Sequence, residues 1–122
     1  MALNEDNQMP CCIRAYGEGT LLLKDESRII RSVIINHKQT VIEWRPRSIE
    51  ELLPEDFDLI LDQKPNIVLL GTGPNFQFQS AKTLAPLYNR GIGVECMDTG
   101  AACRSFVALF AESRNVLAAL II

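Results

Sequence analysis

Two strand-to-helix junctions organise this sequence: IVLLGTGPNFQFQ at residues 67–79 and GVECMDTGAACRSF at residues 93–106. The first leads from an apolar run at residues 67–70 to the helix expected at 80–89, and the second leads from the strand expected at 94–97 into the helix expected at 99–113. In open α/β folds, ligands bind outside the carboxyl ends of the strands. We therefore expect any ligand site at these two loops, although neither contains a recognisable catalytic set.

The second half of the chain alternates between strand and helix patterns. Apolar residues at helical spacing predict three helices, at residues 54–63, 80–89 and 99–113. Continuous apolar runs predict three strands, at residues 67–70, 94–97 and 116–122. The pattern makes the strand at 94–97 central. The strand at 116–122, if it lies at an edge, would offer unpaired backbone to a second copy of the chain.

The first half of the chain has a different pattern. Short β-rich runs separated by turn signals over residues 13–44 predict an antiparallel meander. Residues 1–12 are polar and acidic and are expected to form a disordered N-terminal arm, which leaves residues 13–122 as a single domain. Ser48 and Glu51 have the spacing of a capping box. The two pairing styles in one small domain predict a layered α/β structure.

Composition excludes several classes of function. With 48% hydrophobic and 22% charged residues, the 122-residue chain has the balance of a soluble globular protein. Its net charge of −3 argues against a nucleic-acid partner. No apolar run approaches the roughly 20 residues of a membrane-spanning helix, so no membrane insertion is expected. The first twelve residues lack the features of a secretory or organellar signal, which predicts a cytoplasmic location.

The cysteines do not indicate a metal site. The chain has four cysteines, no C-x-x-C pair and a single histidine, His37. Cysteine and histidine together therefore cannot complete a zinc set. A reduced protein without metal or cofactor is the expectation.

The loop Gly71-Thr72-Gly73-Pro74 permits two interpretations. It follows a strand and precedes a helix, which is where backbone amides can hold an anion. It lacks the third glycine of a dinucleotide fingerprint and the Gly-Lys-Ser/Thr of a P-loop. The alternative is a tight turn that uses glycine for positive φ.

The second junction contains four polar or reactive candidates. Cys103 beside Arg104, early in a helix, could form a reactive thiolate, or it could be an inert part of the apolar stripe. Glu95, inside its strand, suggests either an ion pair with Arg104 or Lys82, or a role in proton transfer. Asp98 and Thr99 are expected to cap the following helix. No catalytic residue is assigned, and the leading hypothesis is non-enzymatic.

Two aromatic residues, Phe76 and Phe78, flank Gln77 in the first loop. If the loop is exposed, they are candidates for contact with another protein. The alternative is that both rings fold back onto the sheet.

Three motifs together resemble the adipogenesis-associated Mth-domain family of small proteins of largely unknown function. They are Leu70-Gly71-Thr72-Gly73, Glu95-x-Met97-x-Thr99-x-x-Ala102-Cys103-Arg104, and Asn115-x-Leu117-Ala118-Ala119-Leu120-Ile121, with Ser32–Ile35 and Trp44 in support. The resemblance implies a three-layer α/β domain with a mixed central sheet. The family includes a mitochondrial assembly factor for respiratory complex I that works by protein contact. Ser105-Phe106-Val107 departs from the Thr-Tyr/Phe-Asn that usually follows Cys-Arg.

The leading hypothesis is a non-enzymatic cytoplasmic interaction or assembly protein that binds a protein partner and can self-associate. The alternative is a protein, whether an enzyme or a simple binding protein, that binds a small molecule or anion where residues 71–74 and 98–104 meet at the strand ends. The candidate ligand-binding residues are Gly71, Thr72, Gly73, Glu95, Asp98, Thr99, Cys103 and Arg104.

Overall fold

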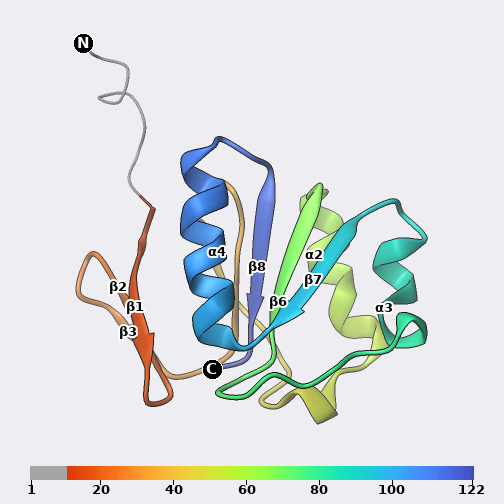
Figure 1. Ribbon diagram of the computed structural model, residues 1–122, viewed down its shortest axis with the longest axis horizontal. Helices are drawn as coiled ribbons and strands as arrows, with labels where there is room; N and C mark the ends of the chain where they lie inside the picture. The colour runs from red at the N-terminus through yellow and green to blue at the C-terminus, as the bar shows by residue number, and fades with distance from the viewer. Residues whose placement is uncertain (1–10) are drawn as a thin grey trace.

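The computed structural model describes residues 11–122 and arranges them around a mixed five-stranded sheet (Figure 1). The order of its strands is β5-β4-β8-β6-β7. Their bounds are β4 (Val33–Ile35), β5 (Val41–Glu43), β6 (Ile67–Gly71), β7 (Gly93–Met97) and β8 (Val116–Leu120). β6 runs parallel to both β7 and β8, whereas β4 is antiparallel to both β5 and β8.

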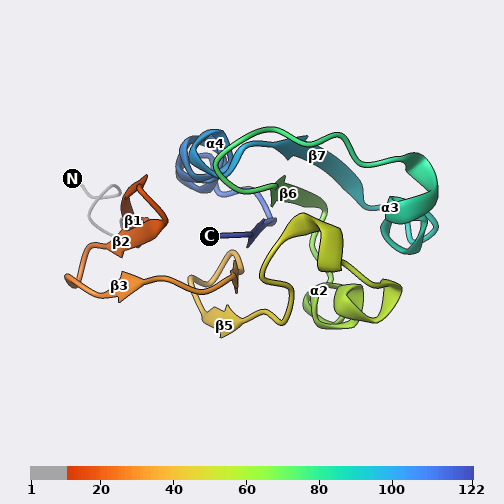
Figure 2. The same ribbon diagram turned by 90° about the horizontal axis from the view of Figure 1, so that it is seen from below.

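A second sheet and several helices cover the two faces of the central sheet. The small antiparallel sheet consists of β1 (Ile13–Gly17), β2 (Thr20–Leu23) and β3 (Arg28–Ile29). The helical segments are the 3₁₀ turns η1 (Ile49–Glu51) and η2 (Pro54–Phe57) and the helices α2 (Asp58–Gln63), α3 (Ala81–Tyr88) and α4 (Thr99–Ala111). Figures 1 and 2 show α4 and the small sheet on one side of the central sheet, with α2 on the other. The α/β class and the mixed sheet are therefore confirmed.

The central sheet divides the interior into two cores. Alternate residues of β8 face opposite sides, so that Ala118 packs toward α4 and Ala119 toward α2 and α3. The first core contains the fully buried Phe106, and the second contains Phe57. Burying a side chain of this size stabilises the fold by about 1.5–3 kcal/mol. Two apolar faces on one sheet require cover on both sides, which produces the three layers.

The structure settles the positions of two strands, one of which was predicted wrongly. β8 lies between β4 and β6 and is buried on both faces, so it cannot pair with a second copy of the chain. β7, predicted to be central, lies at the edge, and its residues are exposed or half-buried. Short apolar runs identify strands but not their neighbours, because pairing depends on long-range register.

The predicted meander is divided between the two sheets. β1, β2 and β3 form one antiparallel sheet, whereas β4 and β5 form a hairpin that joins the central sheet through β4. All three residues of β4 are buried, which explains the division, since a strand that is apolar on both faces needs cover on both.

Two residues that were assigned to the N-terminal arm, Cys11 and Cys12, lie in the described structure. Residues 1–10 lie outside the described part of the chain, whereas Cys11 and Cys12 belong to the domain. Cys11 is buried in the first core, and the carbonyl of Cys12 accepts a hydrogen bond from Lys24 N at 2.8 Å.

The three predicted helices are present with modified ends. The segment at 54–63 begins as 3₁₀ and becomes α-helical at Asp58. Ser80 caps α3 by accepting a hydrogen bond from Thr83 N at 3.2 Å. The capping box does not form, because Ser48 makes no side-chain cap hydrogen bond and Glu51 accepts from Arg47 N. Within residues 11–122, none of the helices combines the length and apolar character required to cross a membrane.

Gly71 should tolerate no side chain. A Cβ at this position would lie 2.8 Å from Thr99 Oγ1 and 3.1 Å from Leu120 Cδ2. We expect Gly71→Ala to reduce the free energy of unfolding by about 1–3 kcal/mol, as overpacking does elsewhere. Urea denaturation measures this. Gly93→Ala is the matched control in a neighbouring strand, because its Cβ would come no closer than 3.8 Å to another atom. Equal stability of the two variants would contradict the prediction.

Candidate functional site

The hydroxyl of Thr99, the first residue of α4, ties together the carboxyl ends of β6 and β8. Its Oγ1 accepts a hydrogen bond from Gly73 N at 2.8 Å and donates one to Ile121 O at 2.6 Å. Thr99 is fully buried, and its own amide donates to Gly73 O at 2.8 Å. Ile121 N donates to Gly71 O at 3.0 Å. The protein's own groups therefore close the strand ends where a ligand was expected.

The loop after β6 is organised by Thr72. Its amide donates to Met97 O at 2.9 Å, and its hydroxyl donates to Asn75 O at 2.9 Å while accepting from Gln77 N at 3.0 Å. An anion cradle would need the amides of Thr72 and Gly73, and both donate inside the protein. Gly73 has a φ of 108°, as the tight-turn interpretation expects.

The polar residues of the second junction do not converge. Of the two predicted caps, Asp98 accepts a hydrogen bond from Ala101 N at 2.8 Å and caps α4, whereas the Thr99 hydroxyl bonds to Gly73 and Ile121 instead. Glu95 is exposed on the edge strand β7 rather than held in a central strand. Among the described residues, no ion pair joins Glu95 to Arg104 or Lys82. Arg104 is exposed on α4, so the ligand-site candidates separate into buried and outward-facing groups.

Cys103 has the environment of an inert thiol. It is 4% exposed and packs in the same core as Phe106. Burial raises its pKa to about 12, with a further contribution from nearby Cys11, while Arg104 acts in the opposite direction. At neutral pH the thiol is protonated, whereas a nucleophilic cysteine must be a thiolate. In residues 11–122, no three His, Cys, Asp or Glu side chains gather into a possible metal site.

Phe76 and Phe78 point outward from the first loop. Their side chains are 55% and 77% exposed, and neither belongs to the described cores. Gln79 Nε2 donates to Phe78 O at 2.9 Å, which together with the Thr72 contacts shapes this loop locally. The loop therefore displays two aromatic rings on a base held by hydrogen bonds.

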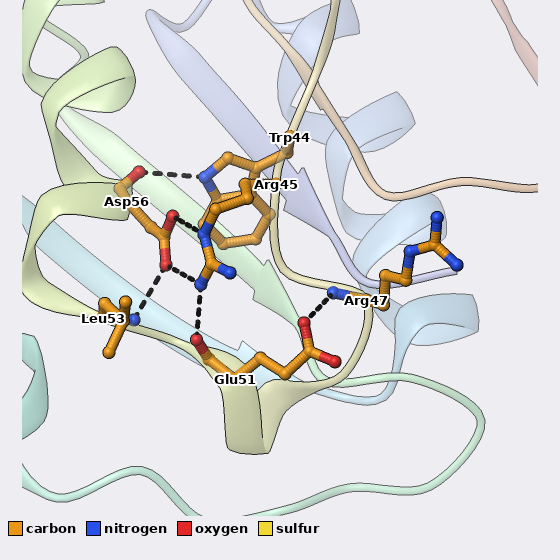
Figure 3. A network of polar contacts seen from close by, with 6 residues as sticks. All are labelled: Trp44, Arg45, Arg47, Glu51, Leu53 and Asp56. Carbon is orange, nitrogen blue, oxygen red and sulfur yellow. Dashed lines mark hydrogen bonds and ion pairs between the residues drawn. The ribbon is translucent and has the colours of Figure 1, made fainter.

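A polar network that the motif analysis missed fixes the segment after β5 (Figure 3). Arg45 Nε donates to Asp56 Oδ1 at 2.8 Å, and one terminal nitrogen of Arg45 donates to Oδ2 at 2.7 Å. Asp56 Oδ2 also accepts from Leu53 N at 2.8 Å, while Trp44 Nε1 donates to Asp56 O at 2.9 Å. These bonds attach η2 to the end of β5.

The electrostatics of this network follow from its geometry. The Asp56 side chain is only 6% exposed, and the bidentate Arg45 guanidinium lowers the pKa of its carboxyl below the ordinary value of 3.8. Figure 3 shows the Arg47 side chain directed away from Asp56, with only its backbone amide in the network. The two arginines of the WRPR sequence at residues 44–47 are a visible sign of a polar site, but nothing in the sequence identifies Asp56 as the partner of Arg45.

The fold and the closed strand ends define a small three-layer α/β domain. Residues 13–121 match the family described as proteins of unknown function, DUF498/DUF598. The chain belongs to this family, and its fold is that of a Mth938-like domain.

Two solved structures and one curated relative illustrate the similarity. A protein of Xanthomonas campestris is 32% identical with a TM-score of 0.82, covering 100% of this chain and 92% of that one. A Mth938-like domain of Bordetella pertussis is 25% identical with a TM-score of 0.71, covering 98% and 91%. The NADH dehydrogenase [ubiquinone] 1 alpha subcomplex assembly factor 3 of Mus musculus is 38% identical over 85 residues, 68% of this chain and 46% of that protein. The chain thus spans about half the length of the curated relatives that it first matches.

The reactivity of Cys103 provides a chemical test. Because Cys103 is buried and its pKa is raised to about 12, we expect iodoacetamide at neutral pH to label it more slowly than the half-buried Cys96. Peptide mass spectrometry over a time course measures each rate, and the protein in denaturant is the control. Faster labelling of Cys103 than of Cys96 would restore the reactive-thiol hypothesis.

The Arg45–Asp56 pair should contribute to stability. Arg45→Met leaves the buried Asp56 carboxylate with only the Leu53 amide, so we expect a loss of about 1–3 kcal/mol at pH 7. Arg31→Met is the control, because it removes an exposed pair with Glu43 and should cost less than about 1 kcal/mol. Urea denaturation measures both variants.

The same comparison has a predicted pH dependence. A carboxyl whose pKa is lowered by folding stabilises the folded state at pH values above the pKa that it has in the unfolded chain. This contribution is lost as the pH falls through the pKa of the folded state. The difference in free energy of unfolding between wild type and Arg45→Met should therefore have its full size above pH 3.8 and shrink below it. A constant difference across this range would contradict the assignment to Asp56.

Proposed function

We propose that this protein is a non-enzymatic protein-interaction or assembly factor that binds a protein partner through the loop at residues 72–79. The observation that carries the proposal is the outward display of Phe76 and Phe78. Aromatic anchors supply much of the binding energy of protein interfaces. Because Thr72 holds the base of the loop, less conformational entropy would be lost when a partner binds.

A neighbouring hollow can extend this surface. It has a volume of about 450 Å³ and lies between the η2 region and α3, the helix that follows the aromatic loop. Its lining is largely apolar: Leu52, Leu53, Pro54, Phe57, Lys82, Thr83, Ala85, Pro86 and Asn89. Leu53 is itself half exposed. An interface that includes both the loop and the hollow would remove several exposed apolar groups from water.

The relatives named as assembly factors for NADH dehydrogenase support the assembly part of the proposal. The hydrogen bonding at the strand ends argues against the alternative of a small-molecule or anion site, since the amides at Thr72 and Gly73 are already occupied. The cytoplasmic location and self-association stay predictions.

Removal of both loop aromatics should abolish partner capture. We expect affinity pull-down with wild-type protein to recover a stoichiometric partner and the Phe76→Ala, Phe78→Ala variant to lose it. Two anchors worth about 1–2 kcal/mol each would reduce affinity by at least tenfold. Val107→Ala removes an exposed apolar side chain from α4, outside the proposed surface, and is the control. Full retention of the partner by the double variant would disprove a role for this loop.

A further inference from the structure

A second hollow lies at the β5 side of the central sheet. Its volume is about 690 Å³, within the range of ligand-binding clefts. We call it the arginine groove. It is lined by residues from distant parts of the chain: Ile30, Arg31, Ser32, Glu43, Trp44, Arg45, Arg47, Leu59 and Ile122. None of the residues predicted to bind a ligand lines it.

The lining of the groove is positively charged, although the whole chain has a net charge of −3. It contains three arginines and one glutamate. Arg45 is held by Asp56, and Arg31 pairs with Glu43 at 2.5 Å. Arg47 differs, because its guanidinium makes no hydrogen bond or ion pair with any residue in the described part of the chain. The groove therefore offers an uncommitted guanidinium, the group best suited to bidentate binding of a carboxylate.

Apolar groups lie beside these charges. The buried ring of Trp44 contributes to the wall, and Ile30 and Leu59 are 74% and 40% exposed. Ser32, also in the lining, is buried and its hydroxyl has no hydrogen-bond partner among the described residues. The groove thus combines exposed apolar surface with the Arg47 guanidinium, which has no partner among the described residues.

We propose that the arginine groove binds an extended segment of a partner protein in which an acidic side chain lies next to an apolar one. The inference rests on the proposed interaction function and adds the chemistry of the segment that is recognised. The acidic side chain would pair with Arg47, and the apolar side chain would cover Ile30 and Leu59. Charge complementarity of this kind sets specificity and accelerates association. The groove's rim is formed by exposed side chains, which suits a segment of chain lying across it.

Selection from a random dodecapeptide library displayed on phage tests the proposal directly. With wild-type protein as bait, enriched peptides should carry Asp or Glu beside an aliphatic or aromatic residue. Synthetic versions of these peptides should bind Arg47→Glu at least tenfold more weakly than wild type, and raising the salt concentration should also weaken binding. Ile30→Ser should weaken binding several-fold without affecting folding, because Ile30 makes little contact with the core.

Arg90→Glu is the matched control. It makes the same change of charge at an exposed position between α3 and β7, at the amino end of the parallel strands. The groove lies at their other end, because its lining residue Ile122 follows the carboxyl end of β8. Arg90→Glu should bind the peptides as wild type does. Equal thermal midpoints of the variants and wild type would show that the fold is intact.

Several outcomes would overturn the proposal. Enriched peptides without acidic residues, or with equal affinity for Arg47→Glu and wild type, would show that the groove is not the site. The absence of any enriched peptide would reject it, and saturable binding of hexanoate alone would assign the groove to a small acid. Loss of the natural partner in the Phe76→Ala, Phe78→Ala variant, with no peptide selected, would leave the proposed function standing without this inference. Selection of acidic peptides that need Arg47, with no natural partner captured through the loop, would support the groove and contradict the proposed role of the aromatic loop.

Discussion

The C-terminal strand β8 holds the two halves of the chain together. It pairs in parallel with β6 from the second half and antiparallel with β4 from the first, and its five residues are fully buried. The two small residues Ala118 and Ala119 face opposite cores, so the layers above and below can approach closely. The hydroxyl of Thr99 then fixes the end of this strand against β6. Without β8, the β4–β5 hairpin of the first half and the parallel strands of the second half would not belong to one sheet.

This closure has a consequence for function. The carboxyl ends of parallel strands usually provide ligand sites, but here their amides and the Thr99 hydroxyl satisfy one another. Buried polar groups that already have partners gain little from a ligand. Surfaces elsewhere on the domain include the aromatic loop, which presents two rings, and the arginine groove, which presents guanidinium groups. Both present side chains of the kinds that are frequent at protein interfaces.

The Arg45–Asp56 pair connects the fold to the second of these surfaces. By binding Asp56 with two hydrogen bonds, Arg45 anchors the segment 44–47 to η2, and this segment forms one wall of the groove. Arg47, two residues further on, lines the groove, and its guanidinium has no partner within residues 11–122. One arginine therefore acts structurally, and its neighbour is available for binding.

The sequence by itself determined the elements of this protein. Helical spacing located α2, α3 and α4, apolar runs located β6, β7 and β8, and Asp98 was identified as a cap, because these features depend on neighbours within a few residues. The family motifs also indicated the three-layer class. Tertiary structure alone decided that β8 is central and Glu95 is on an edge, that Thr99 closes the loop, and that Arg45 meets Asp56. The physical reason is that each of these depends on groups distant in the chain, whose pairing is set by packing and register rather than by local pattern.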